Sequence, residues 1–311
     1  MTGLRHYAFA LGPLAAAALW GGMYVVSKWS FALVPPVTLG FCRVALGGAA
    51  LWLGLRAVTL LRPGSHSGVD RADWPAFVEL GGWVALTIAT QFLGTDLTNA
   101  SQGSLLTVLT PVFVVVLGAA LLGERVTRLK AAGIGLAAAG TVVVLAGQYD
   151  LAAITSGNAV GVGLLVLASL AWAGYTVRGV AVVRRYSALT AATYSTLAAV
   201  PMLGLLAAVE LWYLGRGVGA VALGSEAVLA VAYLGLAATA AAWYLWYKGL
   251  EFVPSGTVAV FFFVQPVVGI ALGAALLGEQ VAPGFLAGGA LIGAGVWVVS
   301  RERGDGRRTS R

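Results

Sequence analysis

The sequence predicts an all-α integral membrane protein of ten transmembrane helices, arranged as two inverted five-helix repeats. Three observations predict this fold class. Hydrophobic residues make up 59% of the 311 residues and charged residues only 10%, whereas a soluble domain is about a quarter charged. Apolar runs of about 20 residues, the length that crosses the hydrocarbon core of a bilayer, recur along the chain. Two segments of the chain also repeat each other, with their flanking charges exchanged.

Ten apolar runs define the expected spans, and the loops between them are too short to hold a separate soluble domain. We expect helices over residues 8–31, 36–61, 75–93, 102–122, 130–147, 158–179, 188–212, 226–248, 255–277 and 282–300. The first five form one repeat (1–148) and the last five the second (158–300). A basic tail, 301–311, follows them.

The arginines and lysines set the expected orientation. With a cytoplasmic N-terminus, 16 of the 19 lie in cytoplasmic segments and only Lys28 and Arg216 in outer ones, while Arg43 lies within the second span. Such a bias follows the positive-inside rule. We therefore expect both termini in the cytoplasm, and a multi-pass protein of the cell membrane. The net charge of +7 belongs to this membrane pattern and does not indicate nucleic-acid binding.

The repeat is visible in the residues themselves. Residues 111–145 align without a gap on residues 266–300, with 18 identities in 35 pairs. The stretch Leu117–Glu124 matches Leu272–Glu279 at all eight positions, and Trp20 aligns with Trp172 in a second, shorter match. Five helices is an odd number, so the second copy must enter the membrane upside down. Inverted repeats of this kind are typical of secondary transporters, which bind their solute where the repeats meet.

The flanking charges agree with the inversion. The loop after the matched block holds Arg125, Arg128 and Lys130 in the first half, whereas its counterpart in the second half holds no basic residue. The opposite exchange follows the first helix of each half, where Arg178, Arg184 and Arg185 appear only in the second copy.

Polar and aromatic residues at helical spacing predict a shared cavity, because lipid-facing surfaces are plainly aliphatic. Six spans, drawn from both halves, carry such stripes. The expected substrate-binding residues are Trp20, Tyr24, Arg43, Gln91, Trp172, Trp243, Phe261 and Gln265. For any single stripe, tight packing inside the bundle is an equal alternative. Helices 5 and 10 instead carry glycines and almost no polar atoms, which favours packing, and a homodimer through these two helices is one form it could take.

Several charged residues and prolines are candidates for a functional or a structural role. Arg43 is a charge inside a span, which is costly and points to a functional role, or it reaches to the outer headgroups. Lys28 has the same alternatives. Glu124 and Glu279 each precede a helix, whose N-terminus favours a negative charge. Pro111 and Pro266 should bend helices 4 and 9 and are candidate hinges.

The sequence contains no motif that indicates a proton relay, ATP binding or catalysis. Both histidines lie outside the spans, no carboxylate lies at mid-membrane, and the Walker A phosphate loop and the H-E-x-x-H and G-x-S-x-G motifs are missing. We therefore expect no cofactor, no metal site and no catalytic residues. An intramembrane enzyme and a non-transporting receptor or scaffold remain competing hypotheses.

The stretch Leu19–Lys28, the pair Pro35–Pro36, and Arg43 resemble the EamA family of the drug/metabolite transporter superfamily. The closest likeness lies in the paired blocks Leu109–Val126 and Gln265–Val281, and the resemblance covers nearly the whole chain. It implies a ten-helix inverted-repeat fold, alternating access and a small-molecule metabolite or amino-acid substrate, often exported. An amphipathic or aromatic zwitterion or anion fits the sequence best. A multidrug cation exporter is the alternative, although no buried acid is visible to meet a cation.

Overall fold

The computed structural model describes residues 8–62, 69–98, 103–104, 106–107, 109–148, 158–217, 224–277 and 283–305. Every regular element within these ranges is helical. The first half contains α1 (Ala8–Trp20), α2 (Met23–Ser30), α3 (Pro36–Leu61), η2 (Arg71–Asp73), α4 (Trp74–Leu97), α6 (Leu109–Leu122) and α7 (Arg128–Gln148). The second half contains α9 (Ala159–Tyr186), α10 (Ala188–Tyr213), α11 (Ser225–Ala232), η4 (Tyr233–Ala241), α12 (Ala242–Leu250), α13 (Ser255–Ala259), η5 (Val260–Phe263), α14 (Val264–Leu277) and α15 (Gly284–Asp305).

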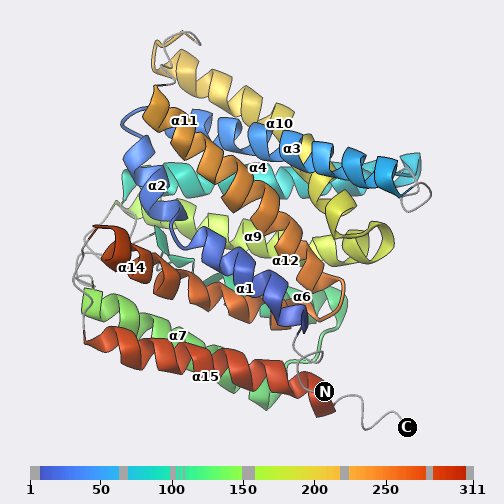
Figure 1. The fold of residues 1–311 in the computed structure, drawn as a ribbon, viewed down its shortest axis with the longest axis vertical. Helices are drawn as coiled ribbons and strands as arrows, with labels where there is room; N and C mark the ends of the chain where they lie inside the picture. The colour runs from blue at the N-terminus through green and yellow to red at the C-terminus, as the bar shows by residue number, and fades with distance from the viewer. Residues whose placement is uncertain are drawn as a thin grey trace.

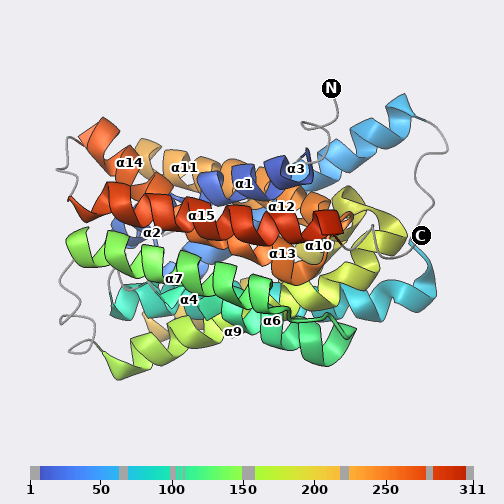
Figure 2. The same cartoon turned by 90° about the horizontal axis from the view of Figure 1, so that it is seen from below.

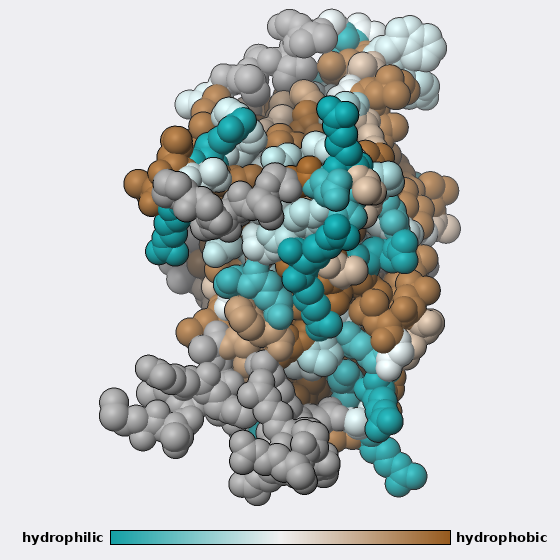
Figure 3. All heavy atoms as spheres, turned by 90° about the vertical axis from the view of Figure 1, so that its right-hand side faces the viewer, coloured by the Kyte–Doolittle hydropathy of each residue, from teal (hydrophilic) through white to brown (hydrophobic). Residues whose placement is uncertain are grey.

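These helices confirm a multi-pass membrane fold. Within the described ranges, nine helical segments are long and apolar enough to cross a bilayer, and α6 adds a shorter apolar helix between α4 and α7. The segments run side by side, so that α1 begins and α15 ends at the same side of the molecule (Figure 1). That side carries a band of hydrophilic side chains bordered by hydrophobic ones (Figure 3). We call it the charged face.

Helices 5 and 10 pack against each other within one chain. They are α7 and α15, which lie together along one edge of the bundle (Figures 1 and 2). Glycines let their backbones approach closely. A Cβ at Gly288 would stand 2.5 Å from the Gly140 carbonyl oxygen, and one at Gly295 would stand 2.4 Å from that of Gly133. This glycine seam agrees with the expected packing role. A contact with a partner subunit stays a prediction.

Several other spans are interrupted. The first is divided at Gly21–Gly22, between α1 and α2. Helix 8 widens into the π-helical segment η4, and helix 9 passes from α13 through the 3₁₀ turn η5 into α14. Irregular backbone at membrane depth occurs in proteins where it is buried or lines a cavity.

The candidate hinge prolines lie beside such interruptions. Pro111 and Pro266 are both in the first turn of their helices, α6 and α14. A proline in a first turn removes a backbone donor that would have no intrahelical partner. Each proline therefore lies where its missing donor costs little, and α14, the helix of Pro266, follows directly on the 3₁₀ turn η5. Their role as moving hinges stays a prediction.

The structure corrects the expected surroundings of several charged residues. Arg178, Arg184 and Arg185 lie on the last turns of α9, not in a loop after it. Glu124 does serve a helix N-terminus, but that of α13 and not that of the helix that follows it. Its carboxylate accepts hydrogen bonds from the Ser255 backbone N–H (2.8 Å) and hydroxyl (2.9 Å). Glu279 lies outside the described residues.

Glu210 also serves the N-terminus of a helix. Its carboxylate accepts hydrogen bonds from the backbone N–H groups of Val37 (2.9 Å) and Thr38 (2.7 Å), and from the Thr38 hydroxyl (2.8 Å). These groups form the first turn of α3, which begins at Pro36. Glu210, on the last turn of α10, therefore caps a helix of the other half.

Candidate functional site

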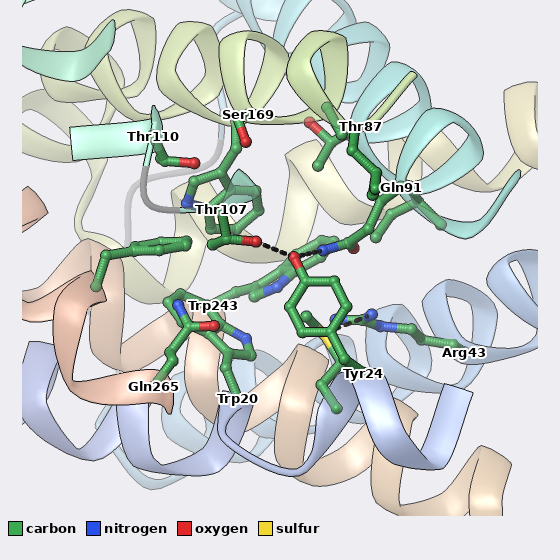
Figure 4. Close-up of a pocket in the computed structure, with 16 residues that line it drawn as sticks. Trp20, Tyr24, Arg43, Thr87, Gln91, Thr107, Thr110, Ser169, Trp243 and Gln265 are labelled. Atoms are coloured by element: carbon green, nitrogen blue, oxygen red, sulfur yellow. Dashed lines mark hydrogen bonds between the residues drawn. The ribbon is translucent and has the colours of Figure 1, made fainter. Parts of the chain in front are cut away.

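A cavity lies where the interrupted helices meet α3, α4 and α9 (Figure 4). It draws residues from both halves of the chain. Its lining residues are Trp20, Met23, Tyr24, Arg43, Thr87, Ile88, Gln91, Thr107, Thr110, Leu165, Ala168, Ser169, Trp172, Trp243, Phe262 and Gln265. Gln91 is six residues from the end of α4, and Arg43 is seven from the start of α3. At 1.5 Å per helical residue these depths are about 10 Å. Arg43 and Gln91 therefore lie toward the face opposite the charged one, whereas Trp172 is near the middle of α9 and Trp243 is seven residues from the end of α12 on the charged side.

Arg43 is a buried charge on the wall of this cavity, with 1% of its surface exposed. Its Nε donates a hydrogen bond to the Thr239 hydroxyl (2.8 Å), and Nη2 donates one to the Ala238 carbonyl (3.1 Å). Nη1 points to the Met23 sulfur at 3.1 Å. Among the described residues, no carboxylate lies within ion-pair distance of this guanidinium. Arg43 therefore does not reach the headgroups. Its guanidinium lies over the rings of Phe92 (5.6 Å) and Trp243 (5.9 Å) and has no carboxylate counter-ion among the described residues.

The π-helical segment η4 accounts for the position of Arg43. Both of its oxygen partners, Thr239 and Ala238, lie in η4. The Thr239 hydroxyl in turn donates to the Leu234 carbonyl five residues earlier, at 2.8 Å. Close packing of α3 on η4 depends on Gly47, because a Cβ there would stand 2.5 Å from Thr239 Cγ2. π-Helical turns occur frequently at functional sites.

Next to Arg43, a second polar group is satisfied within the protein. The Tyr24 hydroxyl accepts a hydrogen bond from Gln91 Nε2 (2.8 Å) and also bonds the Thr107 hydroxyl. These three side chains meet in the centre of the close-up (Figure 4). They come from α2, α4 and the segment before α6, so this hydrogen bonding joins three spans of the first half.

Tryptophans form the rest of the wall. The Trp20 and Trp172 rings, which the repeat aligns, meet edge to face at 5.4 Å between centroids. Trp20 also contacts Phe262 (5.3 Å) and donates its indole N–H to the Ala238 carbonyl (2.8 Å). Trp243 packs on Trp172 at 5.6 Å. Aromatic walls with a few convergent polar groups are the usual composition of small-molecule sites.

Two polar side chains of the cavity remain without partners. Gln265 is 4% exposed, and neither its Nε2 nor its Oε1 has a hydrogen-bond partner. The indole N–H of Trp172 is also unpartnered, although that of its repeat mate Trp20 is not. Buried polar groups without a partner are rare in proteins, so each needs an explanation.

Seven of the eight residues that the sequence singled out line this one cavity: Trp20, Tyr24, Arg43, Gln91, Trp172, Trp243 and Gln265. The eighth, Phe261, is buried but does not line it, and its neighbour Phe262 does. The reason is the 3₁₀ turn η5, which changes the direction of successive side chains relative to an α-helix. Whether these residues bind a solute stays a prediction.

Sequence reasoning did not select Met23 or Phe262 for the site. Met23 is an apolar residue between two aromatic candidates, and its sulfur faces Arg43. Thr107, Thr110 and Ser169 carried a usable signal, because small hydroxyl residues at helical spacing lie on the expected stripes. Among the described residues, there is no cluster of histidine, cysteine or carboxylate side chains that could hold a metal ion.

The charged face has its own contacts between the two halves. The Glu124 carboxylate of the α6–α7 loop bonds the start of α13 and lies 3.9 Å from Lys130. Glu79 on α4 pairs with Arg178 on α9 at 2.7 Å. These contacts lie on the charged face, whereas Arg43 lies nearer to the opposite face.

The model of the EamA-like transporter family matches residues 8–146 and again residues 159–301. The chain belongs to this family. The two matches cover both halves, so the internal repeat is also a repeat of the family unit. The members of this family are described as transporters.

Curated relatives support membership of the family along nearly the full length. An "Uncharacterized transporter" of Archaeoglobus fulgidus is 26% identical over 287 residues, 91% of this chain and 95% of that protein. A "Probable terminal-alkyne amino-acid exporter" of Streptantibioticus cattleyicolor is 28% identical over 301 residues, 94% of this chain and 95% of that protein. A solved structure titled "Crystal structure of protein" matches with a TM-score of 0.73 at 21% identity, covering 94% of this chain and 95% of that one. That likeness shows the fold.

Proposed function

We propose that this protein is a secondary transporter, most simply an exporter, of a small organic solute that carries a carboxylate. Amino acids and related amphipathic or aromatic zwitterions or anions form the substrate class. One observation carries the proposal: Arg43 is buried in the cavity wall without a carboxylate partner among the described residues.

A charge buried without a counter-ion is costly, and a solute carboxylate in the cavity would reduce that cost. Three of the five N–H donors of the guanidinium contact Thr239, Met23 and Ala238, and the second N–H of Nη1 and of Nη2 remain to meet a carboxylate in fork geometry. The tryptophan walls would cover the apolar part of such a solute. The relative from Streptantibioticus cattleyicolor, whose name gives an amino-acid exporter, supports the same class.

A multidrug cation exporter is the alternative. A cationic solute would meet Arg43, a like charge, and none of the described residues that line the cavity is acidic. The electrostatics of the cavity therefore favour an anion or a zwitterion over a cation.

Transport proceeds by alternating access between two inverted repeats in the cell membrane, with both termini in the cytoplasm. The positive-inside bias supports this orientation, with the charged face inside. The contacts of Glu124 and Glu79 then close the inner side, while Arg43 and Gln91 line the cavity toward the outer side. The inner contacts must separate for the solute to enter from the cytoplasm.

The experiment is transport into proteoliposomes of purified protein, with radiolabelled L-phenylalanine and L-glutamine as the first probes. Phenylalaninamide, which lacks the carboxylate, should not compete with either. Arg43→Lys keeps the charge but loses the fork, and we expect transport to fall about tenfold or more, since a bond to a charged group is worth about 1.5–3 kcal/mol.

Arg56→Lys is the matched control, because this arginine is exposed at the charged end of α3, over the Trp52 ring. It should transport at the wild-type rate. If Arg43→Lys and Arg43→Met both transport carboxylates normally, the carboxylate assignment fails. Preferential transport of cations such as ethidium would support the multidrug alternative.

A further inference from the structure

The two polar ends of the cavity differ in how much of their hydrogen-bonding capacity the protein uses. At one end, the Tyr24 hydroxyl has two partners, and each nitrogen of Arg43 has a contact within the protein. At the other end, neither amide atom of Gln265 has a hydrogen-bond partner, although only 4% of that residue is exposed.

The two ends are spatially separate. In the close-up, Gln265 and Arg43 lie on opposite sides of the cavity, with the Tyr24 ring between them (Figure 4). A single small group on a solute cannot serve both ends. A solute that fills the cavity therefore presents one group to Arg43 and another to Gln265.

Trp172 is the second side chain of the cavity that has an open donor. Its ring lies between those of Trp243, at 5.6 Å, and Phe262, at 6.4 Å. The indole N–H is unpartnered, whereas the aligned Trp20 uses its own N–H on the Ala238 carbonyl. The repeat thus has one tryptophan whose donor the protein uses and one whose donor is available to a ligand.

The open groups define the chemistry that fits them. The Gln265 amide offers two N–H donors and one acceptor oxygen, and the Trp172 indole adds a donor. A second carboxylate would accept from the donors but leave the amide oxygen unpaired. An ammonium group would pair with the oxygen and face the donors with a charge of the wrong sign. An uncharged group that both donates and accepts, such as a carboxamide, a phenol or an alcohol, can pair with the amide oxygen and with N–H donors at the same time.

We infer that Gln265, with Trp172, determines specificity for solutes that carry an uncharged hydrogen-bonding group at the end away from their carboxylate. The inference rests on the proposed function, because it places that carboxylate at Arg43. A site that hydrogen-bonds such a group discriminates strongly against analogues without it, since its buried polar atoms then stay unpaired.

The test compares two matched pairs of probes in proteoliposomes, namely L-glutamine with L-norleucine and L-tyrosine with L-phenylalanine. In the wild type we expect the polar member of at least one pair to be transported about tenfold better. Gln265→Leu should bring that ratio close to one, chiefly by slowing the polar member. Trp172→Phe should reduce it by less. Gln265→Met gives the same readout if the leucine variant does not fold, as judged by size-exclusion chromatography.

The outcomes separate the two proposals. Equal transport of both members of each pair by the wild type, or a ratio that survives Gln265→Leu, overturns the role of Gln265 and leaves the carboxylate site intact. If none of the four probes moves, and none raises the thermal stability of the wild type, the proposed function fails and this inference fails with it. Loss of the ratio in Gln265→Leu but not in Thr141→Val, a buried variant remote from the cavity on α7, supports it.

Discussion

The glycine seam of α7 and α15 and the cavity helices are two membrane-buried regions with opposite construction. The seam consists of two unbroken helices whose backbones touch through Gly133, Gly140, Gly288 and Gly295. The cavity helices are interrupted at Gly21–Gly22, η4 and η5, and they carry the polar side chains. Regular backbone satisfies its own hydrogen bonds, whereas in η4 a single carbonyl, that of Ala238, accepts hydrogen bonds from both Trp20 and Arg43. One region therefore packs two helices closely together, and the other carries the polar side chains of the cavity.

The largest effect should come from breaking the seam. Gly288→Leu places a side chain where a Cβ already stands 2.5 Å from the Gly140 carbonyl oxygen, so the helices must separate. We expect a loss of about 3 kcal/mol of stability or more, and little folded protein on fluorescence-detected size-exclusion chromatography. Gly289→Leu is the matched control, because nothing lies within 4 Å of a Cβ there. Equal yields of the two variants would mean that the seam does not stabilise the fold.

A smaller effect should come from the junction between the two regions. Glu124 contacts Lys130 of α7 on one side and the start of α13 on the other. Glu124→Gln removes the charge from these hydrogen bonds, and we expect a loss of about 1–3 kcal/mol in thermal unfolding. Glu226→Gln, at the exposed first turn of α11, should unfold as the wild type does. If Glu124→Gln unfolds at the same temperature as Glu226→Gln, the contacts of Glu124 are dispensable for stability.

The smallest effect should come from one hydroxyl of η4. Thr239→Val removes the acceptor that holds Arg43 Nε at 2.8 Å while keeping the shape of the side chain. We expect a loss of about 1 kcal/mol, seen as a roughly fivefold rise in the KM for a carboxylate solute. Thr141→Val on α7 is the matched control, because that buried hydroxyl bonds only its own helix, at the Ala137 carbonyl. A shift in KM in both variants, or in neither, would contradict the role of the Thr239 hydroxyl in holding Arg43.

The sequence by itself determined the membrane fold and most of the cavity. Apolar runs of bilayer length predict spans because lipid cannot satisfy an exposed backbone, so each run must be helical. The expected span 36–61 coincides with α3, whereas 158–179 falls short of the end of α9 at Tyr186 because Arg184 and Arg185 suggested a loop. The stripes placed seven of eight residues correctly around one cavity because a polar side chain cannot face lipid cheaply.

Only the tertiary structure decided which atoms meet. That Glu124 caps α13 and that Glu210 caps α3 depends on contacts between segments 131 and 173 residues apart, and a periodic pattern records only neighbours on one helix. The 3₁₀ turn η5, which turned Phe262 and not Phe261 into the cavity, left no periodic signal either. The sequence could show that Arg43 and Gln265 belong inside the bundle. The sequence could not show that Arg43 has hydrogen-bond partners and that Gln265 has none. The partners of Arg43 come from the backbone and a side chain of η4, and the open amide of Gln265 follows from the packing around α14.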